Sequence, residues 1–227
     1  METIQNILNK KRIDVSDASM RMKTKRVYIT KNNNGKIEAL LTYLEFKKMM
    51  YYNATLILRK RNVSKKYIID NRNEFLIKEL YLYSVGSSHF KGDLNKGIFI
   101  KGSIGTGKTV IIKAFIQIIE DLTHKRIIQL HSQKIASFLK EKGNEYLDKR
   151  PLYVEDIGKE TKEINDFGTK KFLIPEIFNQ RYENGAWTFC CSNYKDASLT
   201  DFYGQTISDR FNEMFNFFEL TGETMRK

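Results

Sequence analysis

The sequence predicts an α/β fold, with helices packed around a parallel β-sheet and a smaller helical region before it. Two observations indicate this fold. From residue 97 onwards, short apolar segments of strand length alternate with longer helical segments. A glycine-rich segment typical of phosphate binding directly follows the first of those strands.

Five short apolar segments are the predicted strands. They are GIFI (97–100), RIIQL (126–130), LYVE (152–155), WTFCCS (187–192) and FFEL (217–220). Strands that alternate with helices in this way are typical of a parallel sheet covered by helices. The pattern leaves the order of the strands in the sheet open.

The N-terminal region has a different organisation. Residues 36–61 and 70–84 contain no glycine or proline and are predicted as two helices, the second capped by Asp70 or Asn71. Residues 85–95 (VGSSHFKGDLN) have the composition of a linker. We therefore predict a helical region at 1–90 and a main domain at 91–227.

Positive charge is concentrated in the N-terminal region. Residues 1–95 carry 19 Lys and Arg against 9 Asp and Glu, whereas 96–227 carry 20 against 18. The densest runs are RMKTKR (21–26) and RKRNVSKK (59–66). Such a segment favours a polyanion or an acidic protein as partner, and ordinary solvated surface charge is the alternative.

Other features of the composition restrict the class of protein. No apolar run approaches the length of a membrane span and METIQNILNKKRID lacks the features of a signal peptide, so we expect a cytoplasmic protein that does not bind membranes. The two cysteines, Cys190 and Cys191, are adjacent in an apolar run, and we expect them to be buried and reduced.

The strongest motif is GSIGTGKT at 102–109, which satisfies G-x-x-x-x-G-K-[ST]. Its glycines let backbone N–H groups turn toward an anion, its lysine reaches the β and γ phosphates, and its last hydroxyl binds Mg²⁺. We predict that a nucleotide with Mg²⁺ is held by Gly102, Ser103, Ile104, Gly105, Thr106, Gly107, Lys108, Thr109 and Val110, with Thr109 on the metal. The motif alone does not separate kinases, GTPases and ATPases.

Polar residues end two later strands. LYVED ends in Glu155 and Asp156, as expected where one carboxylate binds magnesium and its neighbour activates water. WTFCC is followed by Ser192 and Asn193, whose amide can orient a water. Ligands collect at the carboxyl ends of parallel strands, so these residues should converge. An exposed acidic pair and a plain turn asparagine are the alternatives.

These motifs together resemble a known family. GIFIKGSIGTGKT, YVEDIG, FCCSNY, YGQTISDRF and TGETMRK occur in the order and approximate spacing of the AAA+ ATPases of the bacterial replicative helicase loader (DnaC-like) group, which includes IstB-like transposition helpers. The resemblance covers roughly 95–227. It implies an AAA+ P-loop NTPase sheet, with Glu155 on the magnesium side, Asp156 as catalytic base and Asn193 as the sensor 1 residue.

The resemblance also implies two arginines with catalytic roles. Arg210, in ISDRF, matches the arginine that such ATPases present to the nucleotide of a neighbouring subunit, and Arg226 matches the sensor 2 arginine. An arginine supplied by a neighbour would couple ATP binding to assembly into a homo-oligomer. A surface ion pair is the alternative for each.

Two features depart from the family pattern. The acidic pair has the order Glu–Asp, whereas relatives often have Asp followed by Glu or Asp. The base is then one methylene shorter than glutamate, which favours slow hydrolysis with nucleotide binding intact. Thr206 stands where relatives often have a second arginine.

The resemblance implies a DNA replication accessory factor. In this interpretation the N-terminal region docks a replicative helicase, and the assembled ATPase binds single-stranded DNA through 131–144, where Lys134, Lys140 and Lys142 can meet phosphates. The solvated face of a helix is the alternative for these three lysines. One alternative is a transposition helper with a transposase and duplex DNA as partners. Others are a nucleotide-dependent switch with little hydrolysis, and a small-molecule kinase, for which no lid motif is evident.

Overall fold

The computed structural model describes residues 29–31, 37–39, 41–161, 164–166, 169–194 and 196–225. They form two compact units. The first comprises the described residues of Asn95–Thr109 and Ile127–Lys227, and the second comprises those of Glu2–Leu94 and Val110–Arg126. The predicted domain boundary between residues 90 and 91 stays a prediction.

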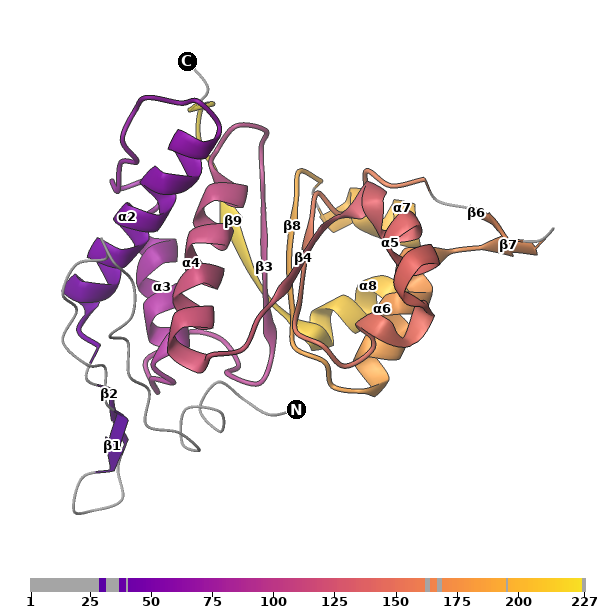
Figure 1. The fold of residues 1–227 in the computed structure, drawn as a ribbon, viewed down its shortest axis with the longest axis horizontal. Helices are drawn as coiled ribbons and strands as arrows, with labels where there is room; N and C mark the ends of the chain where they lie inside the picture. Colours follow the sequence, from indigo (N-terminus) through magenta and orange to yellow (C-terminus); the bar gives the residue numbers. More distant parts are fainter. Residues whose placement is uncertain are drawn as a thin grey trace. The chain divides into compact units, whose positions relative to one another are not determined.

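A five-stranded parallel sheet forms the framework of the first unit (Figure 1). Its order is β4-β5-β8-β3-β9, which places β3 between the last two strands of the chain. The strands are β3 (Gly97–Gly102), β4 (Ile128–His131), β5 (Leu152–Glu155), β8 (Thr188–Ser192) and β9 (Phe215–Leu220). The five predicted strands and their parallel pairing are confirmed, with ends shifted by no more than two residues.

The three central strands, β5, β8 and β3, are largely apolar because both of their faces are buried. Phe99, Val154 and Cys190 belong to a core cluster with helix residues, and the alternate residues Tyr153 and Phe189 are also fully buried. The helices that contribute to this cluster are α5 (Ile135–Lys142), α6 (Leu173–Glu183), α7 (Asp196–Tyr203) and α8 (Gln205–Met214). Cys190 and Cys191 are buried free thiols, as predicted.

Short elements complete the first unit. Two 3-10 turns, η1 (Ser132–Lys134) and η2 (Asn144–Leu147), flank α5. An antiparallel hairpin, β6 (Ile164–Asp166) with β7 (Thr169–Lys171), lies between β5 and α6 in the chain. The sequence pattern does not predict this hairpin, because strands of three residues leave no periodic signal.

The buried guanidinium of Arg181 forms hydrogen bonds with several segments of this unit. The side chain is fully buried on α6 and donates to the carbonyls of Leu147, Arg150 (3.0 Å) and Trp187 (2.8 Å) and to the hydroxyl of Thr188. Burial lowers the pKa of Arg181 to about 10, so the group remains protonated at neutral pH. It ties α6 to the segments that enter β5 and β8.

Arg181→Met is expected to lower the free energy of unfolding by about 3 kcal/mol, because several buried carbonyls lose their donor. Urea unfolding measures this effect. Arg126→Met is the control, since that guanidinium is 88% exposed beside Glu120 and its loss should cost less than about 0.5 kcal/mol. Equal midpoints for the two variants would contradict the structural role of Arg181.

The second unit contains α2 (Tyr43–Lys60), α3 (Glu74–Ser84) and most of α4 (Lys108–Thr123), together with an antiparallel hairpin of β1 (Ile29–Lys31) and β2 (Ile37–Ala39). Aromatic rings hold its helices together. Phe115 of α4 contacts Phe46 of α2 and Tyr83 of α3, with ring centroids 6.3 Å apart in each pair.

The prediction of one helix over 36–61 is wrong at its start. Thr42 forms a capping box with Glu45: its hydroxyl accepts from the Glu45 N–H (3.3 Å), and the Glu45 carboxylate accepts from the Thr42 N–H (2.9 Å). The helix therefore begins at Tyr43, and Ile37–Ala39 is a strand. The second helix is also shorter than predicted, because its N-cap is Asn73 and not Asp70 or Asn71.

The basic run at 59–66 is an ordered turn at the end of α2. Asn62 has a left-handed φ of 58°, and the N–H groups of Asn62 and Val63 donate to the carbonyls of Arg59 (2.9 Å) and Leu58 (3.0 Å), which is a Schellman motif. Its basic side chains are exposed. The other basic run, at 21–26, lies outside the described residues. Nowhere in the described chain is a helix both long and apolar enough to cross a bilayer.

Candidate nucleotide-binding and catalytic site

The phosphate-binding motif forms the connection between β3 and α4, as its sequence predicts. Gly102, Gly105 and Gly107 have φ values of 147°, 86° and 92°, which lie in the region that favours glycine. A Cβ on Gly102 would stand 2.1 Å from the carbonyl oxygen of Leu220, so this position also excludes any side chain for lack of space. The glycines therefore determine the path of the loop.

The ammonium group of Lys108 lies inside this loop. It is only 4% exposed and donates to the carbonyls of Gly102 and Ser103, each at 2.7 Å. The Thr106 hydroxyl donates to the same Ser103 carbonyl at 2.9 Å. The ammonium group can leave these backbone carbonyls and bind a phosphate oxygen instead, because that oxygen carries more negative charge and an anion is favoured at a helix N-terminus.

Two oxygen-bearing side chains lie close to Cys191 on β8. The Thr109 hydroxyl is 3.9 Å from the Cys191 sulfur. Val154 of β5 is paired with Cys190 of β8, and Glu155 is the residue that follows Val154. Burial raises the pKa of the Cys191 thiol, and the charge of Glu155 acts in the same direction. A hydroxyl and a carboxylate fit Mg²⁺, which takes few protein ligands and completes its shell with phosphate and water.

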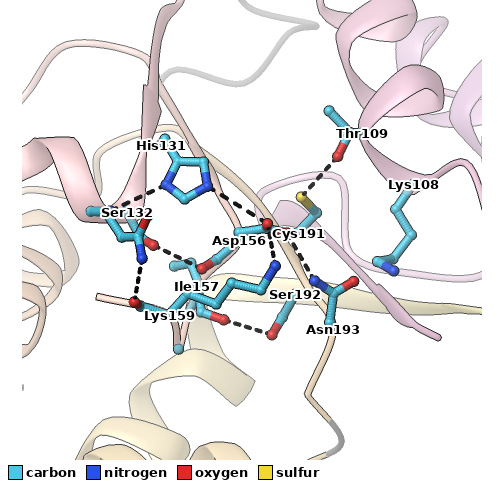
Figure 2. A network of polar contacts seen from close by, with 12 residues as sticks. Lys108, Thr109, His131, Ser132, Asp156, Ile157, Lys159, Cys191, Ser192 and Asn193 are labelled. Atoms are coloured by element: carbon cyan, nitrogen blue, oxygen red, sulfur yellow. Dashed lines mark hydrogen bonds and ion pairs between the residues drawn. The ribbon is translucent and has the colours of Figure 1, made fainter. Parts of the chain in front are cut away.

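The carboxylate of Asp156 is the centre of a polar network (Figure 2). Its Oδ1 accepts from the Asn193 amide at 3.1 Å. Its Oδ2 forms an ion pair with Lys159 at 2.6 Å and lies 3.6 Å from Nε2 of His131. The backbone of Asp156 has a left-handed φ of 57°, and its carbonyl accepts from the Ser132 hydroxyl at 2.8 Å. The predicted convergence of Asp156 and Asn193 is therefore present.

Sequence reasoning missed His131 and Lys159 as members of this network. Both carried a signal: His131 directly follows an apolar strand segment, at the same sheet edge as Asp156, and Lys159 is three residues after Asp156. His131 also accepts a hydrogen bond from the Gln133 N–H (3.3 Å) at Nδ1, which leaves the proton on the Nε2 that faces Asp156.

The turn after Asp156 is tied to β8 and α7. The Ile157 N–H donates to the Cys191 carbonyl (3.0 Å), and the Ile157 carbonyl accepts from Ser192 (2.7 Å). The Gly158 N–H donates to the hydroxyl of Tyr203 (3.0 Å), which also bonds the Glu160 carboxylate. Burial raises the pKa of Tyr203, so its hydroxyl remains protonated. The backbone around Asp156 is thus held at several points.

The C-terminal segment lies on the phosphate-binding loop. The Met225 N–H donates to the Gly105 carbonyl at 2.9 Å, and a Cβ on Gly105 would stand 2.0 Å from the Thr224 hydroxyl. Arg226, which the sequence predicts as a second nucleotide-contacting arginine, lies outside the described residues.

Arg210 lies on α8 and contacts a residue of α6. Its guanidinium is 5.3 Å from the centre of the Tyr182 ring, and the Tyr182 hydroxyl donates to Glu213 one turn later on α8. Thr206 is exposed in the first turn of the same helix. The side chains predicted to meet DNA, those of Lys134, Lys140 and Lys142, are exposed, whereas Ile135 and Leu139 on the same segment are buried.

Several solved structures share this fold. The crystal structure of the DnaC helicase loader aligns with a TM-score of 0.55 at 20% identity, over 76% of this chain and 98% of that one. The chain has the AAA+ fold. DnaI gives a TM-score of 0.53 at 20% identity, over 72% of this chain and 89% of that chain.

A third structure is the replication initiator DnaA bound to AMPPCP and single-stranded DNA. It gives a TM-score of 0.51 at 20% identity, and 69% of this chain covers 49% of that chain. No family model and no curated protein sequence matches the chain. The likeness in structure thus extends to AAA+ proteins whose sequences differ greatly from this one.

Proposed function

We propose that this protein is a cytoplasmic ATPase that assists DNA replication in the manner of a helicase loader. The observation that carries the proposal is the approach of Asn193 to Asp156, 3.1 Å apart, on an AAA+ sheet whose first strand leads into the phosphate-binding loop. A match over 98% of the length of a helicase loader structure supports the comparison with that group.

ATP is the proposed nucleotide and Mg²⁺ its metal. The backbone of 102–110 and the ammonium of Lys108 bind the phosphates, and Thr109 with Glu155 holds the metal. When bound, Mg²⁺ supplies positive charge to the oxygens on which negative charge develops during phosphoryl transfer.

Asp156 is the proposed catalytic base and Asn193 orients the attacking water. A carboxylate oxygen that contacts water accepts its proton as the water attacks the γ-phosphate, and the amide of Asn193 fixes the direction in which that carboxylate points. Arg210 of a neighbouring subunit, and Arg226, offset the charge that develops on the phosphate. The active form is in this proposal a homo-oligomer.

Gly105→Ala is expected to lower nucleotide affinity about tenfold, because the new methyl group displaces the segment at Thr224 and changes the loop. Gly143→Ala is the matched control. Its φ of 88° is close to the 86° of Gly105, but nothing lies within 4 Å of its Cβ. The positive φ alone should cost each variant about 1–3 kcal/mol of stability, and only Gly105→Ala should weaken binding of a fluorescent ATP analogue. Equal affinities for the two variants would contradict the proposed loop.

The proposed partners are a replicative helicase, bound by the N-terminal region, and single-stranded DNA. Capture experiments with the full chain as bait test both against the transposition alternative. Retention of a replicative helicase and of single-stranded DNA in the presence of ATP supports helicase loading. Retention of a transposase and duplex DNA, without helicase, supports the transposition helper.

A nucleotide-dependent switch with little hydrolysis is the second candidate. The ion pair of Asp156 with Lys159 favours it, because it occupies an oxygen that a catalytic base needs. Phosphate release from ATP, measured with and without single-stranded DNA and helicase, decides between the two. Tight nucleotide binding without release under all these conditions identifies the switch.

A further inference from the structure

Lys159 contacts Asp156 through both its backbone and its side chain. Its N–H donates to the Asp156 carbonyl (3.2 Å), which closes a tight turn, and its ammonium lies 2.6 Å from Asp156 Oδ2. The side chain of Lys159 is 38% exposed, compared with 19% for Asp156. The ion pair, drawn in Figure 2, is therefore partly accessible to solvent from the side of Lys159.

Both oxygens of the Asp156 carboxylate have close partners in this arrangement. Asn193 binds Oδ1, and Lys159 and His131 face Oδ2. A water that is to lose a proton to Asp156 must contact one of these oxygens at about 3 Å. An ammonium group at 2.6 Å competes with that water for Oδ2.

Of the three partners, Lys159 is the one most easily withdrawn. Asn193 directly follows β8, and the ring of His131 is held by the Gln133 N–H. Lys159 instead reaches Asp156 with a long, partly exposed side chain that has many alternative rotamers. Its movement away from Asp156 requires no change in the backbone.

The backbone of the turn does not depend on this ion pair. The Ile157 N–H and carbonyl are bound by β8, the Gly158 N–H is bound by Tyr203, and the Gln133 amide donates to the Lys159 carbonyl at 3.1 Å. Removal of the ammonium group should accordingly leave the fold and the nucleotide loop intact.

We propose that Lys159 is a positioning residue that restrains Asp156 and keeps basal hydrolysis slow. The inference rests on the proposed ATPase function, and it deepens that function by naming what limits it. Withdrawal of Lys159 frees Oδ2 for the attacking water, whereas its presence holds the carboxylate in an ion pair.

Lys159→Met tests the inference, because methionine keeps an unbranched side chain of similar reach and removes the charge. We expect a three- to tenfold rise in kcat, with KM and the affinity for a fluorescent ATP analogue within about twofold of the wild-type values. Lys159→Gln should give the same rise, and Lys159→Arg should keep the slow rate. Lys149→Met, at another exposed lysine of the same unit, is the control and should leave kcat unchanged.

A second comparison separates restraint from a merely structural role. In an Asp156→Asn background, Lys159→Met should no longer raise kcat, because the restrained group is absent. A fall in kcat, or no change, in Lys159→Met with retained urea midpoint and nucleotide affinity would overturn the inference while leaving the ATPase function standing. If neither the wild type nor Lys159→Met releases phosphate although both bind nucleotide, the proposed ATPase function itself fails, and the inference with it.

Discussion

Asp156→Asn is expected to lower kcat at least about a hundredfold while nucleotide affinity stays within about threefold of wild type. An amide cannot accept the proton of the attacking water. The substitution should be tolerated structurally, because asparagine is isosteric with aspartate and is among the residues that best adopt the left-handed φ of 57° found here. Steady-state phosphate release and titration with a fluorescent ATP analogue measure the two quantities.

The control for this variant is Asp201→Asn, which changes an exposed carboxylate on α7 and should keep the wild-type kcat. A kcat for Asp156→Asn within a few fold of wild type would show that another group accepts the proton. A loss of nucleotide binding in parallel with kcat would instead assign Asp156 to the binding of the metal or the phosphates.

Arg210→Ala is expected to lower kcat about a thousandfold in the assembled protein, because a guanidinium at the γ-phosphate stabilises the charge of the transition state. Nucleotide binding to the isolated subunit should be nearly unchanged, since the arginine acts on the site of a neighbour. Turnover measured as a function of protein concentration, alongside binding at low concentration, checks both statements.

Arg150→Ala is the matched control for Arg210→Ala. Each guanidinium lies over a tyrosine ring, 4.4 Å from Tyr146 for Arg150 and 5.3 Å from Tyr182 for Arg210. Loss of the ring contact alone should therefore affect both variants similarly, and only Arg210→Ala should lose turnover. Equal rates for the two variants would remove the catalytic role of Arg210.

The sheet and much of the site could be predicted from sequence because their signals are local. LYVE and GIFI are apolar runs of strand length, and a fixed spacing of glycine, lysine and threonine marks the loop at 102–109. Asp156 and Asn193 could be placed together because parallel strands deliver their carboxyl ends to one edge.

The remaining features depend on contacts that no periodicity records. In the sequence, Arg181 looks like an ordinary surface residue of a helix. Its burial instead follows from the backbone carbonyls of the two segments that enter β5 and β8, which its guanidinium pairs. Lys159 pairs with Asp156 across a turn whose backbone is left-handed at Asp156, and the three-residue spacing between them does not by itself predict that turn. The helix predicted from residue 36 begins only at Tyr43, because Thr42 and Glu45 cap it inside a segment that contains no glycine or proline.

A mixing experiment tests most directly the claim that the site is an ATPase centre completed by a neighbouring subunit. Arg210→Ala subunits keep Asp156 and lack the arginine, whereas Asp156→Asn subunits keep the arginine and lack the base. In an equal mixture that assembles at random head to tail, about a quarter of the interfaces combine an intact base with an intact arginine. We predict that the mixture regains about a quarter of the wild-type phosphate release. A mixture no more active than either variant alone would contradict the account.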